Sequence, residues 1–195
     1  MSKRKKYPLR IPKHARGIRV QDVRNGIGRS WWVRRWLSKL EDISLRGRFG
    51  SGRNYAASGQ VVAFSIKDNL ITAKVQGMRD DPYLVTIKFS KPAASVKRRI
   101  ISEIREHPMW MAQMLADELP LELEECFRNL GAYLLPGGKL ASGKYDVTFN
   151  CNCPDYLNPC KHTVAVLFVL IDELTRHPAK LLELRGFKLE ELYES

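Results

Sequence analysis

CNCPDYLNPCKHTVAVLFVLI, residues 151–171, places three cysteines and one histidine at the spacing C-x-C-x6-C-x-H. Just upstream, residues 145–153 alternate between apolar and polar side chains, which predicts a β-strand. Side chains two residues apart on a strand share a face, so the thiols of Cys151 and Cys153 should point the same way. This stretch therefore predicts the end of a strand with two thiols on one face.

A helix is predicted directly after the second half of the motif, over residues 161–174. Cys160 and His162 would then lie at its N-terminus, where the helix dipole favours a thiolate. On the preceding strand, apolar side chains should face inward and polar ones outward. The inward set is Tyr145, Val147 and Phe149, and the outward set is Asp146, Thr148, Asn150 and Asn152.

Three thiolates and one imidazole make a closed tetrahedral shell for zinc. We predict Zn²⁺ as the cofactor, with Cys151, Cys153, Cys160 and His162 as its ligands. The clustering of four soft ligands favours zinc over the alternative, which is three buried thiols and a core histidine. Loss of the metal should unfold at least residues 145–175. The shell leaves no open position for an activated water, so zinc-dependent hydrolysis is not expected.

Two neighbours of the ligands have expected supporting roles. Three thiolates around a divalent ion leave a net charge of −1, which Lys161 is placed to offset. Asp155 could accept a hydrogen bond from a ligand or a turn amide. A plain Asx-turn is the other interpretation of Asp155.

The motif Cys-x-Cys-Pro-Asp-aromatic-x-x-Pro-Cys-Lys-His, followed by an alanine- and valine-rich helix, resembles the SWIM zinc finger. That finger occurs in prokaryotic proteins linked to Swi/Snf-type ATPases, and its metal ligands correspond to the four residues named above. The resemblance implies DNA binding or protein–protein interaction, and no catalytic residues. Softer similarities to stand-alone prokaryotic SWIM proteins extend over about residues 25–190. They are Trp31-Trp32-x-x-x-Trp36 with Leu40-Glu41, Arg53-Asn-Tyr55-Ala56 with Gly59, Ala73-Lys-Val75-Gln76-Gly77, Pro82-Tyr83, and Leu184-Arg185-Gly186.

The helix after His162 is apolar nearly all round over residues 164–171. Such a helix must be covered on most sides. Two interpretations remain open: it joins the zinc unit to the other helices as core, or it forms part of a partner interface.

Outside the motif, period-two alternation over residues 60–90 predicts a three-stranded antiparallel meander with one buried face, which includes Val62, Phe64 and Ile66. Residues 46–53 are rich in glycine and arginine and are predicted to form a flexible loop. Its arginines, with Tyr55, could follow a nucleic-acid backbone or could instead pack on the meander, and both interpretations stay open. Helices are predicted over about residues 30–41, 92–107, 109–119 and 120–131, and from Pro178 onward.

The expected fold class is therefore α+β: an antiparallel three-stranded meander plus helices and a small strand–knuckle–helix zinc unit. We divide the chain into three parts. They are residues 1–58, a basic arm with a tryptophan-bearing helix; residues 59–135, the meander and a helical region; and residues 136–195, the zinc finger and C-terminal helices.

Positive charge is concentrated in the first third of the chain. The formal charge is +12, and residues 1–60 contain 16 Lys/Arg against 3 Asp/Glu. A polyanion, with DNA as the first expectation, is the natural partner of such a segment; the alternative is a solvated tail. The predicted nucleic-acid-binding residues are Lys3, Arg4, Lys5, Lys6, Arg10, Trp31, Arg34, Arg35, Lys39, Arg46, Arg48 and Arg53, with further phosphate contacts from Lys13, Arg16 and Arg19.

The tryptophans of the first helix divide between two roles. Helical spacing places Trp32 and Trp36 on its apolar face, which predicts core packing. Trp31 falls among Arg34, Arg35 and Lys39, as a base-stacking residue would. A residue so near a helix start could instead fold back onto the core, so both interpretations of Trp31 stay open.

Several functional classes are disfavoured. No apolar run reaches the ~18–20 residues that span a bilayer, and the N-terminus lacks a signal-peptide core, so we expect a cytoplasmic protein without a membrane partner. The P-loop-like run from Gly138 to Lys144 is followed by Tyr145 instead of Ser or Thr, so no nucleotide or other small-molecule substrate is expected. We predict a non-catalytic zinc protein that binds nucleic acid; the alternative is an adaptor that docks through its zinc finger onto a Swi/Snf-type ATPase or a recombination partner.

Overall fold

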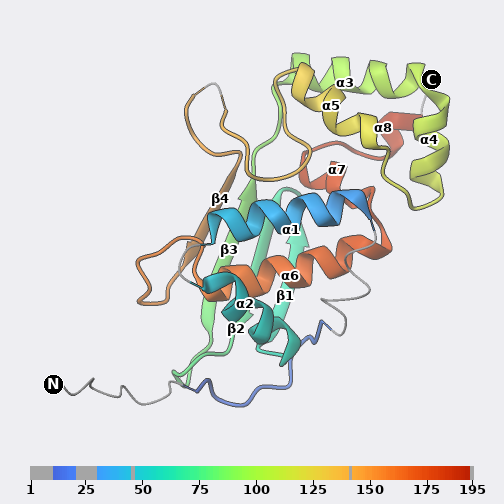
Figure 1. The fold of residues 1–195 in the computed structure, drawn as a ribbon. Helices are drawn as coiled ribbons and strands as arrows, with labels where there is room; N and C mark the ends of the chain where they lie inside the picture. Colours follow the sequence, from blue (N-terminus) through green and yellow to red (C-terminus); the bar gives the residue numbers. More distant parts are fainter. Residues whose placement is uncertain (1–10, 21–29, 45–46, 141, 194–195) are drawn as a thin grey trace, which may run out of the picture.

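The computed structural model describes residues 11–20, 30–44, 47–140 and 142–193. It is an α+β fold in which the strands form one antiparallel sheet of order β1-β2-β3-β4 (Figure 1). The strands are β1 (Val61–Lys67), β2 (Leu70–Val75), β3 (Tyr83–Phe89) and β4 (Val147–Cys151). The helices are α1 (Trp31–Ile43), α2 (Arg48–Ala57), α3 (Ala94–Glu106), α4 (Pro108–Leu115), α5 (Leu121–Asn129), α6 (Lys161–Arg176), α7 (Lys180–Leu184) and α8 (Glu190–Tyr193).

The predicted meander is present as β1, β2 and β3, but the sheet has a fourth strand. β4 pairs antiparallel with β3, and Phe149 lies opposite Ile87. The strand that carries the first half of the metal motif is therefore part of the main sheet. Local alternation predicts each strand but not this pairing, because β3 and β4 are separated by a long helical segment.

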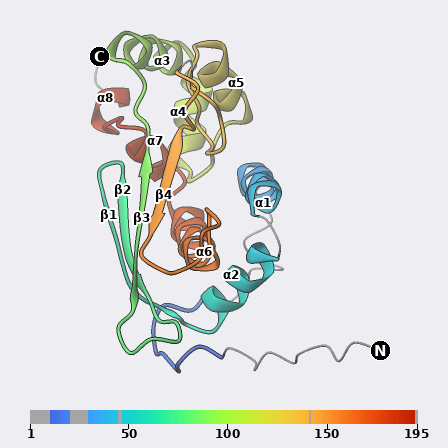
Figure 2. The same cartoon turned by 90° about the vertical axis from the view of Figure 1, so that its left-hand side faces the viewer.

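Helix α6 is the centre of the hydrophobic core. It lies against one face of the sheet, and α1 and α2 lie on its far side (Figure 2). Every residue from Val164 to Ile171 is at most 3% exposed. The helix is therefore intramolecular core, which settles the choice left open by its composition. Trp32 and Trp36 of α1 are also buried, as predicted.

The remaining helices gather at one end of the sheet (Figures 1 and 2). Gly131, in the left-handed region at φ 73°, follows α5 as predicted, and Pro120 is the N-cap of that helix. Pro108, which was expected at the end of the preceding helix, is instead the first residue of α4. Residues from all three parts of the chain contribute to one buried cluster. No helix within the described ranges is long and apolar enough to cross a membrane.

The prediction of a loop over residues 46–53 is wrong for its described part, because α2 begins at Arg48. Glycine and arginine in this helix give no apolar periodicity. Its stability comes instead from packing on α6, since Tyr55 and Ala56 are buried and Gly52 lies directly on Val164.

Gly52→Ala should destabilise the protein by about 1–3 kcal/mol. A Cβ at this position would lie 2.4 Å from Val164 Cγ1 and 2.9 Å from the Lys161 carbonyl oxygen, so the two helices would have to separate. Gly50→Ala is the matched control, because no atom lies within 4 Å of its Cβ position. Thermal unfolding should show Gly50→Ala unchanged or stabilised by up to about 1 kcal/mol. Equal melting temperatures for the two variants would contradict this packing.

Two face assignments in the strands are also wrong. A register shift between Val61 and Ala63 turns Val62 outward and gives Val61 the buried position. At the other edge, β4 begins only at Val147, so Tyr145 is 57% exposed and Asp146 is 1% exposed. The cause of the second inversion is a long-range ion pair: Asp146 accepts a 2.6 Å hydrogen bond from Arg185, which is also buried.

Candidate metal centre

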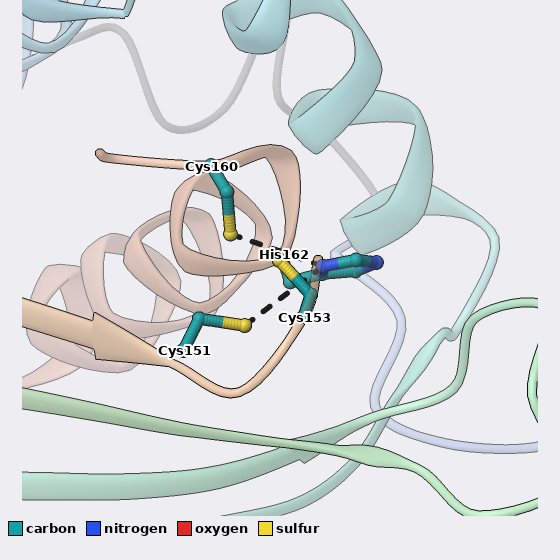
Figure 3. Close-up of side chains that lie close together, drawn as sticks. All are labelled: Cys151, Cys153, Cys160 and His162. Carbon is teal, nitrogen blue, oxygen red and sulfur yellow. Dashed lines mark hydrogen bonds between the residues drawn. The ribbon is translucent and has the colours of Figure 1, made fainter. Parts of the chain in front are cut away.

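The four predicted ligands converge from a strand end, a turn and a helix start (Figure 3). Cys151 is the last residue of β4, and Cys153 follows in the turn. Cys160 is the N-cap of α6, and His162 lies in its first turn. The ligand atoms of all four lie within 4.8 Å of one another. The cluster therefore joins the edge of the sheet to the central helix.

The donor atoms fit a tetrahedral metal ion. Nδ1 of His162 lies 3.9 Å from Sγ of Cys151 and 3.8 Å from Sγ of Cys160. In a tetrahedral zinc site, bond lengths of about 2.3 Å to sulfur and 2.0 Å to nitrogen place those atoms about 3.5 Å apart. All three cysteines have free thiols. The four residues thus form a candidate metal site whose donors would complete a four-coordinate shell.

Hydrogen bonds inside the cluster already favour a thiolate. A hydrogen bond from Cys151, joined by others from His162 and Thr163, lowers the pKa of the buried Cys160 thiol. The same contact with Cys160, together with burial, raises the pKa of Cys151. The thiolate form is therefore favoured at Cys160, at the helix N-terminus, where the dipole stabilises negative charge. A bound cation would supply the charge that stabilises the other thiolates.

Two tyrosines hold the imidazole of His162 in place. The ring of Tyr83 lies 4.5 Å from it and that of Tyr55 lies 5.4 Å from it, measured between centroids. Gly77 allows this close approach, because a Cβ there would lie 2.4 Å from the Tyr83 ring. Nε2 of His162 has no hydrogen-bond partner among the described residues. Packing of the two tyrosine rings thus supports the orientation in which Nδ1 makes its hydrogen bonds with the sulfurs.

Spacing around the metal motif could not identify these packing residues. The softer similarities do include them, since Tyr55, Gly77 and Tyr83 each occur in one of those segments. A resemblance that spans segments far apart in the chain is the signal that could have indicated a shared site.

The metal-binding turn is fixed by Asp155. Its carboxylate accepts two hydrogen bonds from Arg48 of α2, at 3.1 and 3.0 Å, and one from the Leu157 amide at 3.2 Å. The turn interpretation of Asp155 is therefore confirmed, with an ion pair added. Burial alone would raise the pKa of Asp155, but these hydrogen bonds lower it below the usual value. Beside this pair, a cavity of about 450 Å³ reaches Cys153 and His162.

Lys161 lies close to the site but makes a different contact from the one predicted. Its Nζ lies 4.9 Å from the centroid of the Tyr55 ring, a cation–π distance. The same ring packs on His162. Lys161 is thus held beside the negatively charged cluster through an aromatic neighbour.

Three of the predicted nucleic-acid-binding cations form ion pairs within the chain. Arg35 and Lys39 both pair with Glu124 of α5, and Arg48 pairs with Asp155. These acidic partners are 85 or more residues distant in sequence from the cations, so a local charge count does not detect them.

Trp31 folds back onto the core, which is the second of the two interpretations left open by the sequence. Its indole Nε1 donates a 2.7 Å hydrogen bond to the Leu119 carbonyl, and the half-buried ring packs against the core. The guanidinium of Arg35 lies 5.5 Å from the ring centroid. One edge and one face of the indole are therefore occupied within the chain.

The other predicted contacts are distributed as follows. Arg34 is exposed on α1 and Arg53 is half-buried on α2. Arg16 and Arg19 are exposed, and Lys13 pairs with Asp80. Lys3, Arg4, Lys5, Lys6, Arg10 and Arg46 lie outside the described residues.

Comparison with known proteins supports the identity of the motif. Residues 147–171 match the model of the SWIM zinc finger family. An uncharacterized protein of Mycobacterium tuberculosis, Rv2102, is 34% identical over 176 residues, which cover 90% of this chain and 62% of that relative. The chain thus spans less than two thirds of the relative's length. No solved structure matches this chain.

Proposed function

We propose, on the premise that residues 147–171 form a SWIM zinc finger, that this protein is a non-catalytic zinc-binding protein that binds nucleic acid through its basic N-terminal third. One observation carries the second half of the proposal: residues 1–60 contain 16 Lys/Arg and only 3 Asp/Glu. Such a segment neutralises phosphates and releases counterions, with DNA as the first expected ligand.

The proposal that the protein is not catalytic depends on the four side chains that would bind the metal. Three thiolates and one imidazole suit Zn²⁺ and complete its preferred four-coordinate shell. Cys151, Cys153, Cys160 and His162 would hold the ion, and it would supply folding energy by tying β4 to α6. A closed shell offers no position for an activated water.

We assign the phosphate contacts chiefly to the basic arm, which is the segment of the chain that precedes α1. Arg35, Lys39 and Arg48 are engaged by Glu124 and Asp155, so binding through them would require these pairs to open. Lys3, Arg4, Lys5, Lys6 and Arg10 then carry most of the predicted affinity.

The alternative, docking onto a Swi/Snf-type ATPase, loses one of its supports. Residues 164–171 offered the apolar surface for that role, and they are buried in the chain's own core. A complex of this kind would have to use a different surface.

The arm is tested by the variant Lys3→Gln, Lys5→Gln, Lys6→Gln. For duplex DNA, the slope of log K (the binding constant) against log salt concentration should become about 2.7 less negative if each lysine contacts one phosphate. The control is Arg98→Gln, Arg99→Gln, Lys188→Gln, which removes three exposed positive charges from the helical end of the molecule. Binding is measured by fluorescence anisotropy across a salt series. A wild-type protein that binds no nucleic acid, or an arm variant that matches the control, would overturn the proposal.

A further inference from the structure

The sheet has one uncovered face. Helices α6, α1 and α2 all lie on the same side of it, and no helix of the described residues covers the opposite side (Figure 2). The outward-facing positions of neighbouring strands form rows through their pairing. They are Lys67, Leu70, Lys88 and Thr148; Ser65, Thr72, Thr86 and Asn150; and Ala63, Lys74 and Leu84. We call this set the open sheet face.

The open sheet face is positively charged. Lys67, Lys74 and Lys88 are exposed, and none of its positions carries a carboxylate. No carboxylate among the described residues lies within ion-pair distance of these three lysines, whereas Lys97 and Lys180 each pair with a glutamate. The nearest acidic residue in sequence is Asp68, in the turn after β1. A cationic surface without internal partners is complementary to a polyanion.

We infer that the open sheet face is a second nucleic-acid-binding surface, and that it contacts the phosphate backbone of a duplex. The inference rests on the proposed function, because it takes the partner class from it, but it uses different residues.

Spacing supports a backbone ligand. Lys67 and Lys88 flank Leu70 across two strand separations, or about 10 Å. Lys74 lies four residues from Leu70 along β2, or about 13 Å. Duplex DNA carries one charge per about 1.7 Å of helix axis, so a surface of this size faces several phosphates. The hydroxyl groups of Ser65, Thr72 and Thr148 add donors of the kind that bind phosphate oxygens.

The absence of aromatic side chains from the open sheet face favours a duplex over a single strand. Tyr83 and Phe89 are buried on the inner face. Phe64 and Phe149 lie opposite Ala73 and Ile87, which are inner-face residues. Unstacked bases bind to exposed aromatic rings, which the outward rows do not offer.

The test compares three full-length variants with equal charge changes. They are the sheet variant Lys67→Gln, Lys74→Gln, Lys88→Gln, the arm variant, and the helical-end control. For duplex DNA, the sheet variant should lose about 2.7 of the log–log salt slope and bind more weakly than the wild type at 0.1 M salt. Its melting temperature should match the wild type, because these side chains point into solvent. The single variant Lys74→Gln, with an expected slope loss of about 0.9, replaces it if the triple variant does not fold.

Other outcomes would overturn the inference. If the sheet variant binds duplex DNA as tightly as the control does, the three lysines are solvated side chains that do not contact DNA. A wild-type preference for single strands that the sheet variant retains would exclude duplex binding at this face, and selective loss of binding to phosphatidylserine vesicles would assign it to lipid. If only the arm variant loses binding, the proposed function stands and this inference fails. If the wild type binds no nucleic acid, both fail.

Discussion

Cys160→Ala should abolish metal binding and unfold the protein at temperatures where the wild type is folded. Three features make Cys160 important: its side chain is buried, it is the N-cap of α6, and its sulfur lies 3.8 Å from Nδ1 of His162. Structural zinc contributes on the order of 10 kcal/mol to small domains, which matches the whole stability of a typical chain. Because α6 is the centre of the core, the loss should spread well beyond residues 145–175. Metal content and circular dichroism at increasing temperature would measure both effects.

Cys126→Ala is the matched control for the same chemical change. Cys126 is half-buried in α5, away from the metal cluster, and burial raises the pKa of its thiol to about 11. This thiol therefore stays protonated at neutral pH. Its loss should leave the metal content unchanged and cost about 1 kcal/mol or less. A Cys160→Ala protein with normal metal content and melting temperature would refute the role given to that residue.

Arg185→Met should destabilise the protein by about 3–5 kcal/mol, because it leaves the Asp146 carboxylate buried without a counter-charge. Both side chains are almost fully buried. The guanidinium also donates hydrogen bonds to the carbonyls of Leu134 and Ser90, and it lies 5.0 Å from the Phe89 ring centroid. A loss of this size corresponds to a fall in melting temperature of roughly 10 °C for a chain of this length.

The control for Arg185 is Arg176→Met, which removes the exposed ion pairs with Asp172 and Glu173 on α6. Surface pairs contribute about 1 kcal/mol or less, so urea unfolding should barely change. Adding Asp146→Asn to Arg185→Met should recover part of the lost stability, because it removes the uncompensated charge. Equal losses from Arg185→Met and Arg176→Met would contradict the importance of the buried pair.

The metal ligands were predictable because their geometry is local. Two-residue spacing on a strand and a helix start nine residues later determine where Cys151 and His162 point. Trp32, Trp36 and the apolar residues of α6 were predictable for the same reason, since helical periodicity determines their faces.

Apart from the register shift beside Val62, the features that could not be predicted depend on residues far apart in the chain. Asp146 is buried because Arg185 lies beside it, and α2 forms because Gly52 fits against Val164. The charge pattern of α1 resembled a free basic surface, yet Glu124 neutralises part of it. Sequence patterns indicate which side chains are charged or apolar, whereas tertiary contacts decide which of them remain available for a ligand.

We expect the protein to hold one zinc ion through three sulfurs and one nitrogen. Elemental analysis of the purified full-length protein, followed by X-ray absorption at the zinc edge, should find one zinc per chain, with three sulfur neighbours at about 2.3 Å and one nitrogen at about 2.0 Å. A folded protein without bound zinc, or a zinc ion surrounded mainly by oxygen, would contradict this expectation.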